Sequence, residues 1–465
     1  MGNWIRRFSF GLGVLVTILC FALSVAQNSG TPGLGKTVFF VVPAEYDEGE
    51  VKKFRTKLQE NNLKVIQEVS RLLPGSGTVC GNDFWLVERD KKIENEAELN
   101  TLRMKLPLYV KGVFPYGVNP NSGFRPMVAG GNSIPETVNE SERATKLDDV
   151  QSLLNTKGFQ EQLNGIKIAL LDTGKPQHLS INPKDVIEGF NFSLQRNLRN
   201  VGDSRYDQNN LSDLFRPTKK DRELTESKIV GHATGIASLI IGDGFPNNFS
   251  GIARGAKILP IKICDGVGEC GAFQLATGIC KAIQAKVDVI NLSISGPIDA
   301  LAVRSALEAA VASNITVVAA AGNYAPNFTG KREDTNPLRY PVSYALPNSE
   351  FTASSGIIGV GAVNQKGDAV ANFSRRSDGI TVVAPGENIW VASRGKELFV
   401  SEKGTSYSTA WVTGLVALLK AQNPTWTPQK IKEHIIKTAT PLPNCPATDC
   451  GKGLINFPRA LNVER

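Results

Sequence analysis

Apolar and small residues beyond about residue 145 occur in short, uninterrupted runs that are separated by helical stretches. The runs lie at 166–172, 257–263, 287–293, 316–322 and 356–363. Apolar runs without polar alternation are typical of parallel strands that are covered on both faces of a sheet. Helical patterns at 273–286 and 299–313 lie between them. This alternation predicts an α/β domain with a doubly wound, mainly parallel sheet.

The chain from 37 to 116 has a different pattern. An apolar strand at 37–42 precedes an amphipathic helix at 47–62, and a second helix around 95–105 precedes a closing strand at 108–114. Strands and helices of this length predict a small α+β module that is separate from the larger domain.

Two further segments have the composition of a linker and of a signal peptide. Residues 117–145 are rich in Gly, Pro, Asn, Ser and Glu and show no periodicity, which is typical of a linker. The first 26 residues contain two arginines, an apolar run and small residues up to Ala26, as in a secretory signal peptide. An uncleaved membrane anchor is the alternative, because the apolar stretch 8–26 approaches a membrane-spanning length. The predicted organisation is therefore signal peptide 1–26, module 27–116, linker 117–145 and main domain 146–465.

The charge of the chain does not point to nucleic acid. The 465 residues include 52 Lys and Arg against 44 Asp and Glu, which gives a formal charge of +8. No run of basic residues is longer than two, whereas a phosphate-binding surface needs clustered cations. We therefore expect no nucleic-acid partner, and no stable membrane insertion once the signal is removed.

The cysteines indicate an oxidising compartment, either extracellular or periplasmic. Seven are present, and removal of the signal peptide with Cys20 leaves six that can form disulfides. Cys445 and Cys450 flank a short turn and are close enough in sequence to pair, whereas the other pairings stay open. A zinc site is not expected, because the chain has no CxxC spacing and has three histidines.

Four polar residues lie where strands or turns lead into helices. Asp172 and Asn323 end apolar runs, and ligands of such sheets bind beyond the carboxyl ends of the strands. His232 begins an apolar helix after a glycine, and Ser406 follows a Gly-Thr turn at the start of another. Each alone suits an ordinary turn or cap. Together they match a carboxylate, a base, a nucleophilic hydroxyl and an amide that donates to an oxyanion.

From about residue 145 to 460 the sequence resembles the subtilisin-like serine proteases, peptidase family S8. The similar segments, in chain order, are DTG at 172–174, GHATG at 231–235, VDVINLSISGP at 287–297, VVAAAGN at 317–323 and GTSYSTA at 404–410. The chain order Asp, His, Ser is that of subtilisin. The resemblance implies a serine endopeptidase in which Asp172 orients His232, His232 is the general base and then acid, and Ser406 is the nucleophile. Asn323 and the Ser406 N–H group would form the oxyanion hole.

The resemblance also implies how substrate binds. Protein or peptide substrates would pair with a strand formed by Ser293, Ile294 and Ser295, opposite a second segment formed by Gly268, Glu269 and Cys270. No cofactor is required; calcium is a possible structural ion, although the sequence shows no clear acidic cluster for it.

More weakly, the module resembles the inhibitory propeptide of the family. We expect its end, residues 108–117, to lie against Ser293, Ile294 and Ser295 as an intramolecular inhibitor. Self-cleavage is then expected between about Tyr116 and Lys146. Removal of the module would leave an unpaired thiol, unless Cys80 tethers the module by a disulfide; a permanent accessory domain is the alternative.

Three departures from the family pattern affect the surroundings of these residues. Tyr407-Ser408-Thr409-Ala410-Trp411 replaces the usual Met-Ala-Ser-Pro-His, and His232-Ala233-Thr234-Gly235 replaces His-Gly-Thr-His. Ser295 replaces a usual glycine. None of these changes removes a catalytic group. The alternative function is a catalytically silent, secreted binding protein of the same fold.

Overall fold

The computed structural model describes much of the chain. The described residues are 35–42, 47–93, 98, 101–102, 113–116, 125–126, 139–193, 231–243, 245, 250–264, 268, 270–297, 299–324, 339–346, 351–394 and 398–463. The predicted signal peptide and most of the predicted linker lie outside these residues. Within them, no helix combines the length and the apolar character that crossing a membrane requires.

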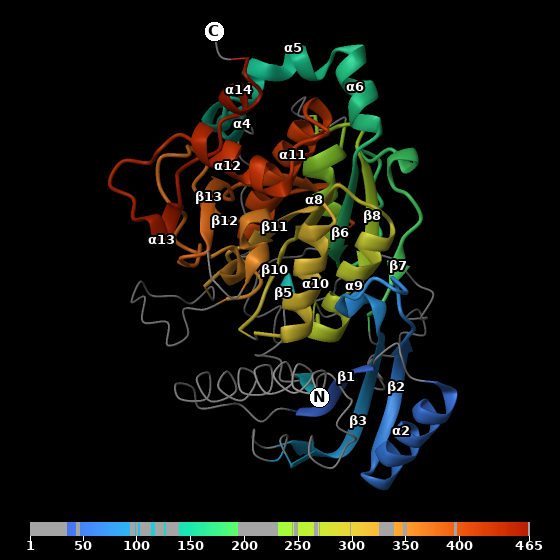
Figure 1. Cartoon of the computed structure of the whole chain (residues 1–465). Coiled ribbons are helices and arrows are strands. Elements are labelled where there is room, and N and C mark those ends of the chain that lie inside the picture. Colours follow the sequence, from blue (N-terminus) through green and yellow to red (C-terminus); the bar gives the residue numbers. More distant parts are fainter. Residues whose placement is uncertain are drawn as a thin grey trace, which may run out of the picture.

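A sheet of seven parallel strands forms the centre of the larger domain in the described part of the chain (Figure 1). Its order is β13-β12-β11-β9-β6-β8-β7, and each neighbouring pair is parallel. The strands are β6 (Lys167–Asp172), β7 (Phe190–Asn191), β8 (Lys257–Lys262), β9 (Val289–Leu292), β11 (Thr316–Ala320), β12 (Ile357–Val363) and β13 (Ile380–Pro385). The predicted doubly wound α/β fold is therefore confirmed.

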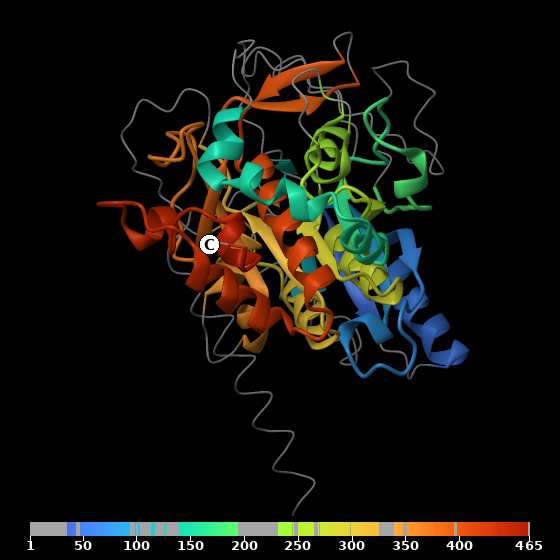
Figure 2. The same ribbon diagram turned by 90° about the horizontal axis from the view of Figure 1, so that it is seen from above.

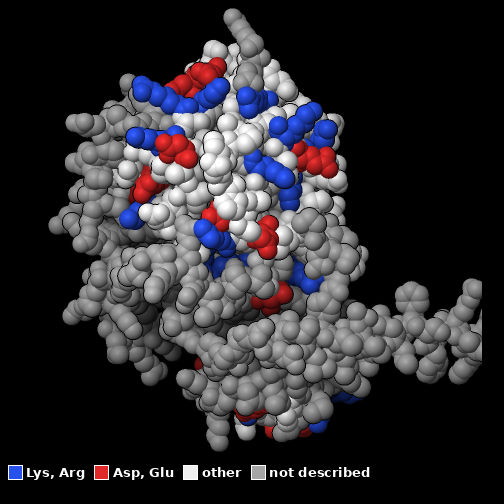
Figure 3. Space-filling view, turned by 90° about the vertical axis from the view of Figure 1, so that its left-hand side faces the viewer, with Lys and Arg blue, Asp and Glu red and all other residues white. Residues whose placement is uncertain are grey.

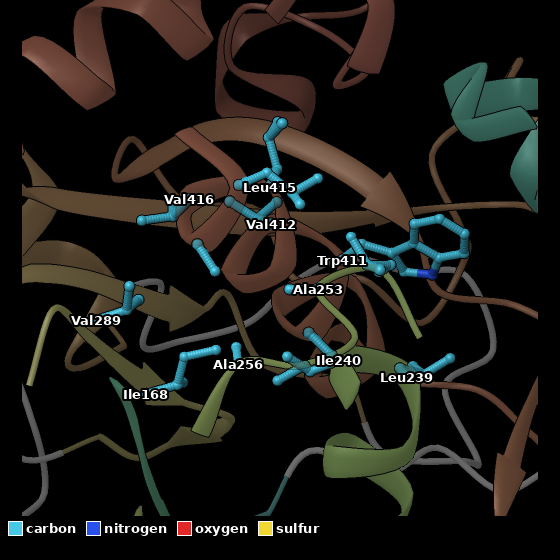
Figure 4. Packing of buried hydrophobic residues seen from close by; sticks show 14 of the residues in the cluster. Ile168, Leu239, Ile240, Ala253, Ala256, Val289, Trp411, Val412, Leu415 and Val416 are labelled. Carbon is cyan, nitrogen blue, oxygen red and sulfur yellow. The ribbon is translucent and has the colours of Figure 1, made fainter. Parts of the chain in front are cut away.

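Helices cover both faces of this sheet. One layer contains α6 (Lys157–Asn164), α8 (His232–Ile241), α11 (Thr405–Gln422) and α12 (Pro428–Thr438), and the other contains α9 (Ala272–Gln284) and α10 (Leu301–Ala312). Along β6, Ile168 and Leu170 pack with α8 and α11, whereas Ala169 and Leu171 pack with α9 and α10. Figure 4 shows the first of these clusters. Because both faces are buried, the strands need apolar residues at consecutive positions.

The N-terminal module contains an antiparallel sheet of order β2-β3-β1-β4 and one covering helix. Its elements are β1 (Gly35–Val42), α2 (Glu48–Glu60), β2 (Leu63–Val69), β3 (Asp83–Ile93) and β4 (Val113–Tyr116). Phe54 and Leu58 of α2 pack on Val42, Trp85 and Val87 of the sheet. The predicted α+β module is present, while β2 and β3 were not predicted. Of the second predicted helix, residues 98, 101 and 102 are described and are helical.

The described residues of the range predicted as a linker form regular elements at two places. β5 (Arg125–Pro126) pairs with β10 (Ile294–Ser295), and α4 (Asn139–Thr145) continues into η2 (Leu147–Val150) and α5 (Gln151–Leu154). The expectation of no regular structure is therefore wrong at these places, although the domain limits themselves stay predictions. The remaining elements are η1 (Val79–Gly81), η3 (Pro183–Asp185), η4 (Val342–Ala345), η5 (Thr352–Gly356), β14 (Ile389–Ala392), β15 (Phe399–Glu402), α13 (Ala447–Cys450) and α14 (Phe457–Ala460).

Three disulfides join the six cysteines that follow Cys20. Cys445 and Cys450 are paired, which confirms the one pairing that the sequence suggested. Cys264 pairs with Cys270, and Cys80 of the module pairs with Cys280 of α9. In Figure 2 the module (blue) lies beside α9 and α10 (yellow).

Basic and acidic side chains are interspersed on the part of the surface that Figure 3 describes. Neither sign of charge forms a continuous patch over the described residues of this face. The described residues of this face therefore show no concentration of positive charge.

A buried carboxyl group in α4 makes stability depend on pH. Burial, together with the neighbouring Asp148 carboxyl, raises the pKa of Glu142 from its ordinary 4.5 to about 8. Between these pH values the folded chain retains a proton that the unfolded chain has lost, so this group's contribution to stability falls as pH rises through that window. Since one pKa unit corresponds to about 1.4 kcal/mol, we expect Glu142→Gln to raise the free energy of unfolding by on the order of a few kcal/mol at pH 8 and to leave it unchanged at pH 4.

Urea unfolding at both pH values measures this effect. The matched control is Glu161→Gln, because Glu161 is 66% exposed and forms a solvent-exposed pair with Lys157. An equal response of the two variants at pH 8 would show that Glu142 is not the group responsible.

Candidate active site

Asp172 and His232 form a buried, hydrogen-bonded pair at the carboxyl end of the sheet. Asp172 is the last residue of β6, and its Oδ1 atom accepts hydrogen bonds from His232 Nδ1 at 2.8 Å, Thr173 N at 2.7 Å and Thr173 Oγ1 at 3.1 Å. Both the carboxylate and the imidazole are fully buried. The pair fixes the ring orientation and leaves Nε2 as the nitrogen that is available for chemistry.

His232 owes its position to the turn that begins α8. Gly231 precedes it with φ 98°, a left-handed conformation that strains residues with a Cβ atom. The Thr173 hydroxyl also accepts a hydrogen bond from Ala233 N at 3.1 Å, so the strand end and the first turn of the helix are joined directly. The whole of α8 is buried and packs on α11, which carries Ser406.

Ser406 lies in the first turn of α11 and is linked to Ser293 in both directions. Its Oγ atom donates to the Ser293 carbonyl at 2.9 Å, and Ser293 Oγ donates to the Ser406 carbonyl at 3.1 Å. Asn291 Nδ2 donates to Ser293 Oγ at 2.9 Å, and Thr413 Oγ1 donates to Asn291 Oδ1 at 2.8 Å. This buried network fixes the start of α11 against the segment that follows β9.

Asn323 is oriented by Thr405, the residue before Ser406. Asn323 Oδ1 accepts from Thr405 N at 3.1 Å and from Thr405 Oγ1 at 2.9 Å. Since both partners donate, the oxygen of the amide must face Thr405 and the NH₂ group must point elsewhere. Gly322 N in turn donates to Thr405 Oγ1 at 3.2 Å, which ties the turn after β11 to the start of α11.

His232 Nε2 and Asn323 Nδ2 are buried without a hydrogen-bond partner among the described residues, as is Asp172 Oδ2. An unpaired buried polar group costs about 1–3 kcal/mol, so such groups are rare in native structures. Each is the free end of a side chain whose other polar atom is firmly bonded. His232 and Asn323 therefore present one acceptor or base and one donor beside the first turn of α11.

The strand predicted to pair with substrate is occupied by another part of the chain. Ile294 and Ser295 form β10 and pair in antiparallel register with Pro126 and Arg125 of β5. Of the predicted occupant, residues 108–117, the described residues 113–116 form β4 and pair with β1 inside the module, so the prediction is wrong for them; the others lie outside the described residues. That strand completes the sheet of its own module and is not available to β10.

The predicted opposing segment is not a strand in the described residues. Gly268 adopts a left-handed φ of 79°, and Cys270 is buried and paired with Cys264, with which it forms an isolated bridge. Glu269 lies outside the described residues. A role of this segment in substrate binding stays a prediction.

Comparison with known proteins identifies the family. The subtilase family model, Peptidase_S8, matches residues 163–454. The chain belongs to the subtilase family. It is 34% identical over 229 residues to Subtilisin E of Bacillus subtilis (strain 168), covering 49% of this chain and 55% of that protein. It is 30% identical over 337 residues to an intracellular serine protease of Paenibacillus polymyxa, covering 71% of this chain and 89% of that protein.

The subtilase also resembles a solved structure. Fervidolysin from Fervidobacterium pennivorans, a keratinolytic enzyme related to subtilisin, matches with a TM-score of 0.61 and 21% identity. The match covers 94% of this chain and 64% of that one. At this identity the likeness shows the fold. The match to Subtilisin E spans just over half the length of that relative.

In this subtilase two departures from the family pattern, Gly235 and Tyr407, offset each other in side-chain size. Tyr407 is fully buried, and its ring centroid lies 6.2 Å from that of His232. A Cβ atom added to Gly235 would lie 3.6 Å from the Tyr407 ring and 3.3 Å from Val391. The glycine in α8 therefore leaves room for the large ring in α11. Trp411 is buried one turn further along and contacts Phe457 of α14.

Three residues of the site in this subtilase were not predicted: Asn291, Thr405 and Thr413. A signal for them exists in the sequence, because an asparagine inside an apolar strand must find a partner when it is buried. Thr405, Thr409 and Thr413 also recur at four-residue spacing, so they share one face of α11. These residues hold the named site residues in place rather than facing a substrate.

Metal binding receives no support from the described residues of the subtilase. Among them, no group of three or more His, Cys, Asp or Glu side chains is arranged to hold a metal ion. Calcium as a structural ion therefore stays a prediction without an assigned site.

Proposed function

We propose that this subtilase is a secreted serine endopeptidase that is made as a precursor and cleaves itself. Asp172 orients His232, His232 accepts and returns a proton, and Ser406 attacks the peptide carbonyl. Family membership supports the reaction class. The buried pair of Asp172 and His232, together with the position of Ser406 in the first turn of α11, supports these roles.

The chemistry follows from the orientation of each group. His232 Nε2 takes the Ser406 hydroxyl proton as the oxygen bonds to the carbonyl carbon, and the same proton then goes to the leaving amine. An acyl-enzyme results, which water hydrolyses by the reverse transfer. Asn323 Nδ2 and the Ser406 N–H group donate to the oxyanion, and the positive end of α11 favours the same charge.

The observation that carries this proposal is the pair of buried, unpartnered atoms, His232 Nε2 and Asn323 Nδ2. Their desolvation is unfavourable in the resting protein and is offset when a substrate supplies their partners. Reaction with a serine-directed fluorophosphonate, followed by peptide mass spectrometry, tests the proposal. We expect one label, on Ser406. Correctly folded protein without any label would favour a catalytically silent binding protein.

Asn323→Ala tests the oxyanion role. We expect kcat to fall by about a hundred- to a thousandfold with KM nearly unchanged, which is the effect known for the corresponding residue of subtilisin itself. The matched control is Asn423→Ala, because Asn423 caps the far end of α11. A mutant with the parent's kcat would remove Asn323 from the mechanism.

The pairing of β5 with β10 supports inhibition of the precursor by its own chain. An added antiparallel strand is a common way to bind a peptide, because main-chain hydrogen bonds supply affinity for any sequence. From Arg125 to Pro126 the chain runs toward Ser293, which contacts Ser406. Self-cleavage is therefore expected a short distance after Pro126, within the range 117–145.

The proposed compartment agrees with the chemistry of the chain. Residues 1–26 have the pattern of a secretory signal, and all three disulfides in the described part of the chain need an oxidising environment to persist. Proteins and peptides are the proposed substrates.

A further inference from the structure

The N-terminal module shares a hydrophobic core with the catalytic unit. Cys80, Phe84 and Leu86 are fully buried in the same cluster as the side chains of α9 and α10. Phe84 of β3 meets Phe273 of α9 edge-on, with ring centroids 6.4 Å apart. Residues of β3 therefore contribute to two hydrophobic cores, because Trp85 and Val87 pack with α2 on the other face of the module sheet.

A buried disulfide lies in the middle of this contact. Cys80 in η1 and Cys280 in α9 are joined across 200 residues of sequence, with Cα atoms 5.3 Å apart and both side chains fully buried. The other two disulfides in the described part of the chain join cysteines that are 6 and 5 positions apart in the sequence. Cys80–Cys280 is thus the bond among these three that joins the module to the catalytic unit.

The cut proposed above falls between the two joined parts. The module ends with β4 at Tyr116, β5 lies on β10 at 125–126, and the catalytic unit follows from α4 at 139. A backbone cut after Pro126 leaves Cys80 on one fragment and Cys280 on the other. The disulfide keeps these fragments covalently connected.

We propose that the module is a permanent part of the enzyme, so that maturation gives a disulfide-linked two-chain molecule instead of a free catalytic domain. This inference rests on the proposed self-cleavage for the two chains, whereas the covalent link itself does not depend on it. An untethered inhibitory strand leaves by dissociation and dilution. A strand on a tethered module keeps an effective concentration in the millimolar range, so dilution alone does not remove it.

The covalent link is tested by digesting the secreted protein with trypsin without reductant. We expect the peptide of residues 72–89, which holds Cys80, to be found joined to that of residues 263–281, which holds Cys280. Reduction should separate the two masses. Recovery of residues 72–89 as a free peptide before reduction would overturn the proposal, whether or not the enzyme cleaves itself.

The two-chain form is tested by denaturing electrophoresis of the same protein. We expect one band near full length without reductant and two fragments with reductant. In Cys80→Ser/Cys280→Ser the fragments should separate in both lanes, whereas the control Cys445→Ser/Cys450→Ser should behave as the parent. Separation of the parent's fragments without reductant would overturn the tether. A single full-length band in both lanes would count against self-cleavage, and the tryptic peptides would then decide the link.

Enzyme kinetics give a further test. A disulfide that only stabilises the fold would not affect how the activity per mole responds to dilution. The rate per mole of the cleaved parent should stay constant within twofold over a hundredfold dilution. In Cys80→Ser/Cys280→Ser it should rise on dilution, because the inhibitory fragment can then leave. A parent that is activated by dilution would contradict the proposal.

Discussion

Ser406→Ala is expected to abolish peptide hydrolysis while the protein keeps its fold. The change removes one oxygen atom from the first turn of α11, and with it the hydrogen bond to the Ser293 carbonyl at 2.9 Å. The reciprocal bond from Ser293 Oγ to the Ser406 backbone remains. We expect kcat to fall by about a millionfold, the loss known for the nucleophile of subtilisin, a member of the same family.

The matched control for this prediction is Ser408→Ala. Ser408 is buried two residues further along α11, and its hydroxyl donates to the Pro385 carbonyl at 3.2 Å. Its loss removes a comparable hydrogen bond without touching the proposed nucleophile, so kcat should stay within a few-fold of the parent. Turnover by Ser406→Ala within tenfold of the parent would show that the assignment of the nucleophile is wrong.

The same variant reports on maturation. Without the nucleophile, the backbone after Pro126 should stay intact, and N-terminal sequencing of the secreted protein should give a single start near residue 27. The parent should give that start and a second one a short distance beyond Pro126. Identical starts in both proteins would rule out self-processing.

The central sheet could be predicted because each of its strands is buried on both faces, which leaves a pattern in the sequence of the strand itself. A strand such as β6, with α8 and α11 on one face and α9 and α10 on the other, needs apolar residues at consecutive positions, and that pattern is visible in the sequence at 168–171. The turns after such strands then limit where polar residues can meet. Asp172 could be selected in this way before any partner was known.

The module strands β2 and β3 are less visible because their environments are mixed. In β2 exposed positions alternate with positions that are half-buried or, at Leu63, buried, and the exposed residues include Lys64 and Glu68, which masks the apolar period. β3 carries charged residues at its end and contributes to two different cores. A pattern based on one apolar face does not describe such a strand.

Two contacts between distant segments could not be derived from the sequence pattern. The Cys80–Cys280 bond depends on how the module docks on α9, and the pairing of β5 with β10 involves two residues on each strand. Two-residue strands have no periodicity. The sequence could indicate that an inhibitory strand exists, but the register that selects Arg125 and Pro126 is a property of the folded chain.

The second large effect is expected for Asp172→Asn, and its mechanism follows from an asymmetry of the carboxylate. Oδ1 accepts three hydrogen bonds, from His232 and from the backbone and side chain of Thr173. Oδ2 is buried and has no hydrogen-bond partner among the described residues. An asparagine with its oxygen at the Oδ1 position keeps these three bonds, removes the negative charge and places an NH₂ group at the Oδ2 position.

Loss of that charge should act on the chemical step. In the proposed mechanism His232 becomes positively charged when it takes the Ser406 proton, and without the Asp172 carboxylate this charge would form in a buried, uncompensated environment. We expect kcat to fall by roughly a thousandfold or more with KM changed little, and Asp172→Ala, which also loses the hydrogen bond, to fall at least as far. Asp185→Asn is the control, because Asp185 is a similarly buried carboxylate that pairs with Lys257 away from His232. Initial-rate measurements on a peptide substrate decide: a loss confined to KM would mean that Asp172 positions the substrate and does not support the proton transfer.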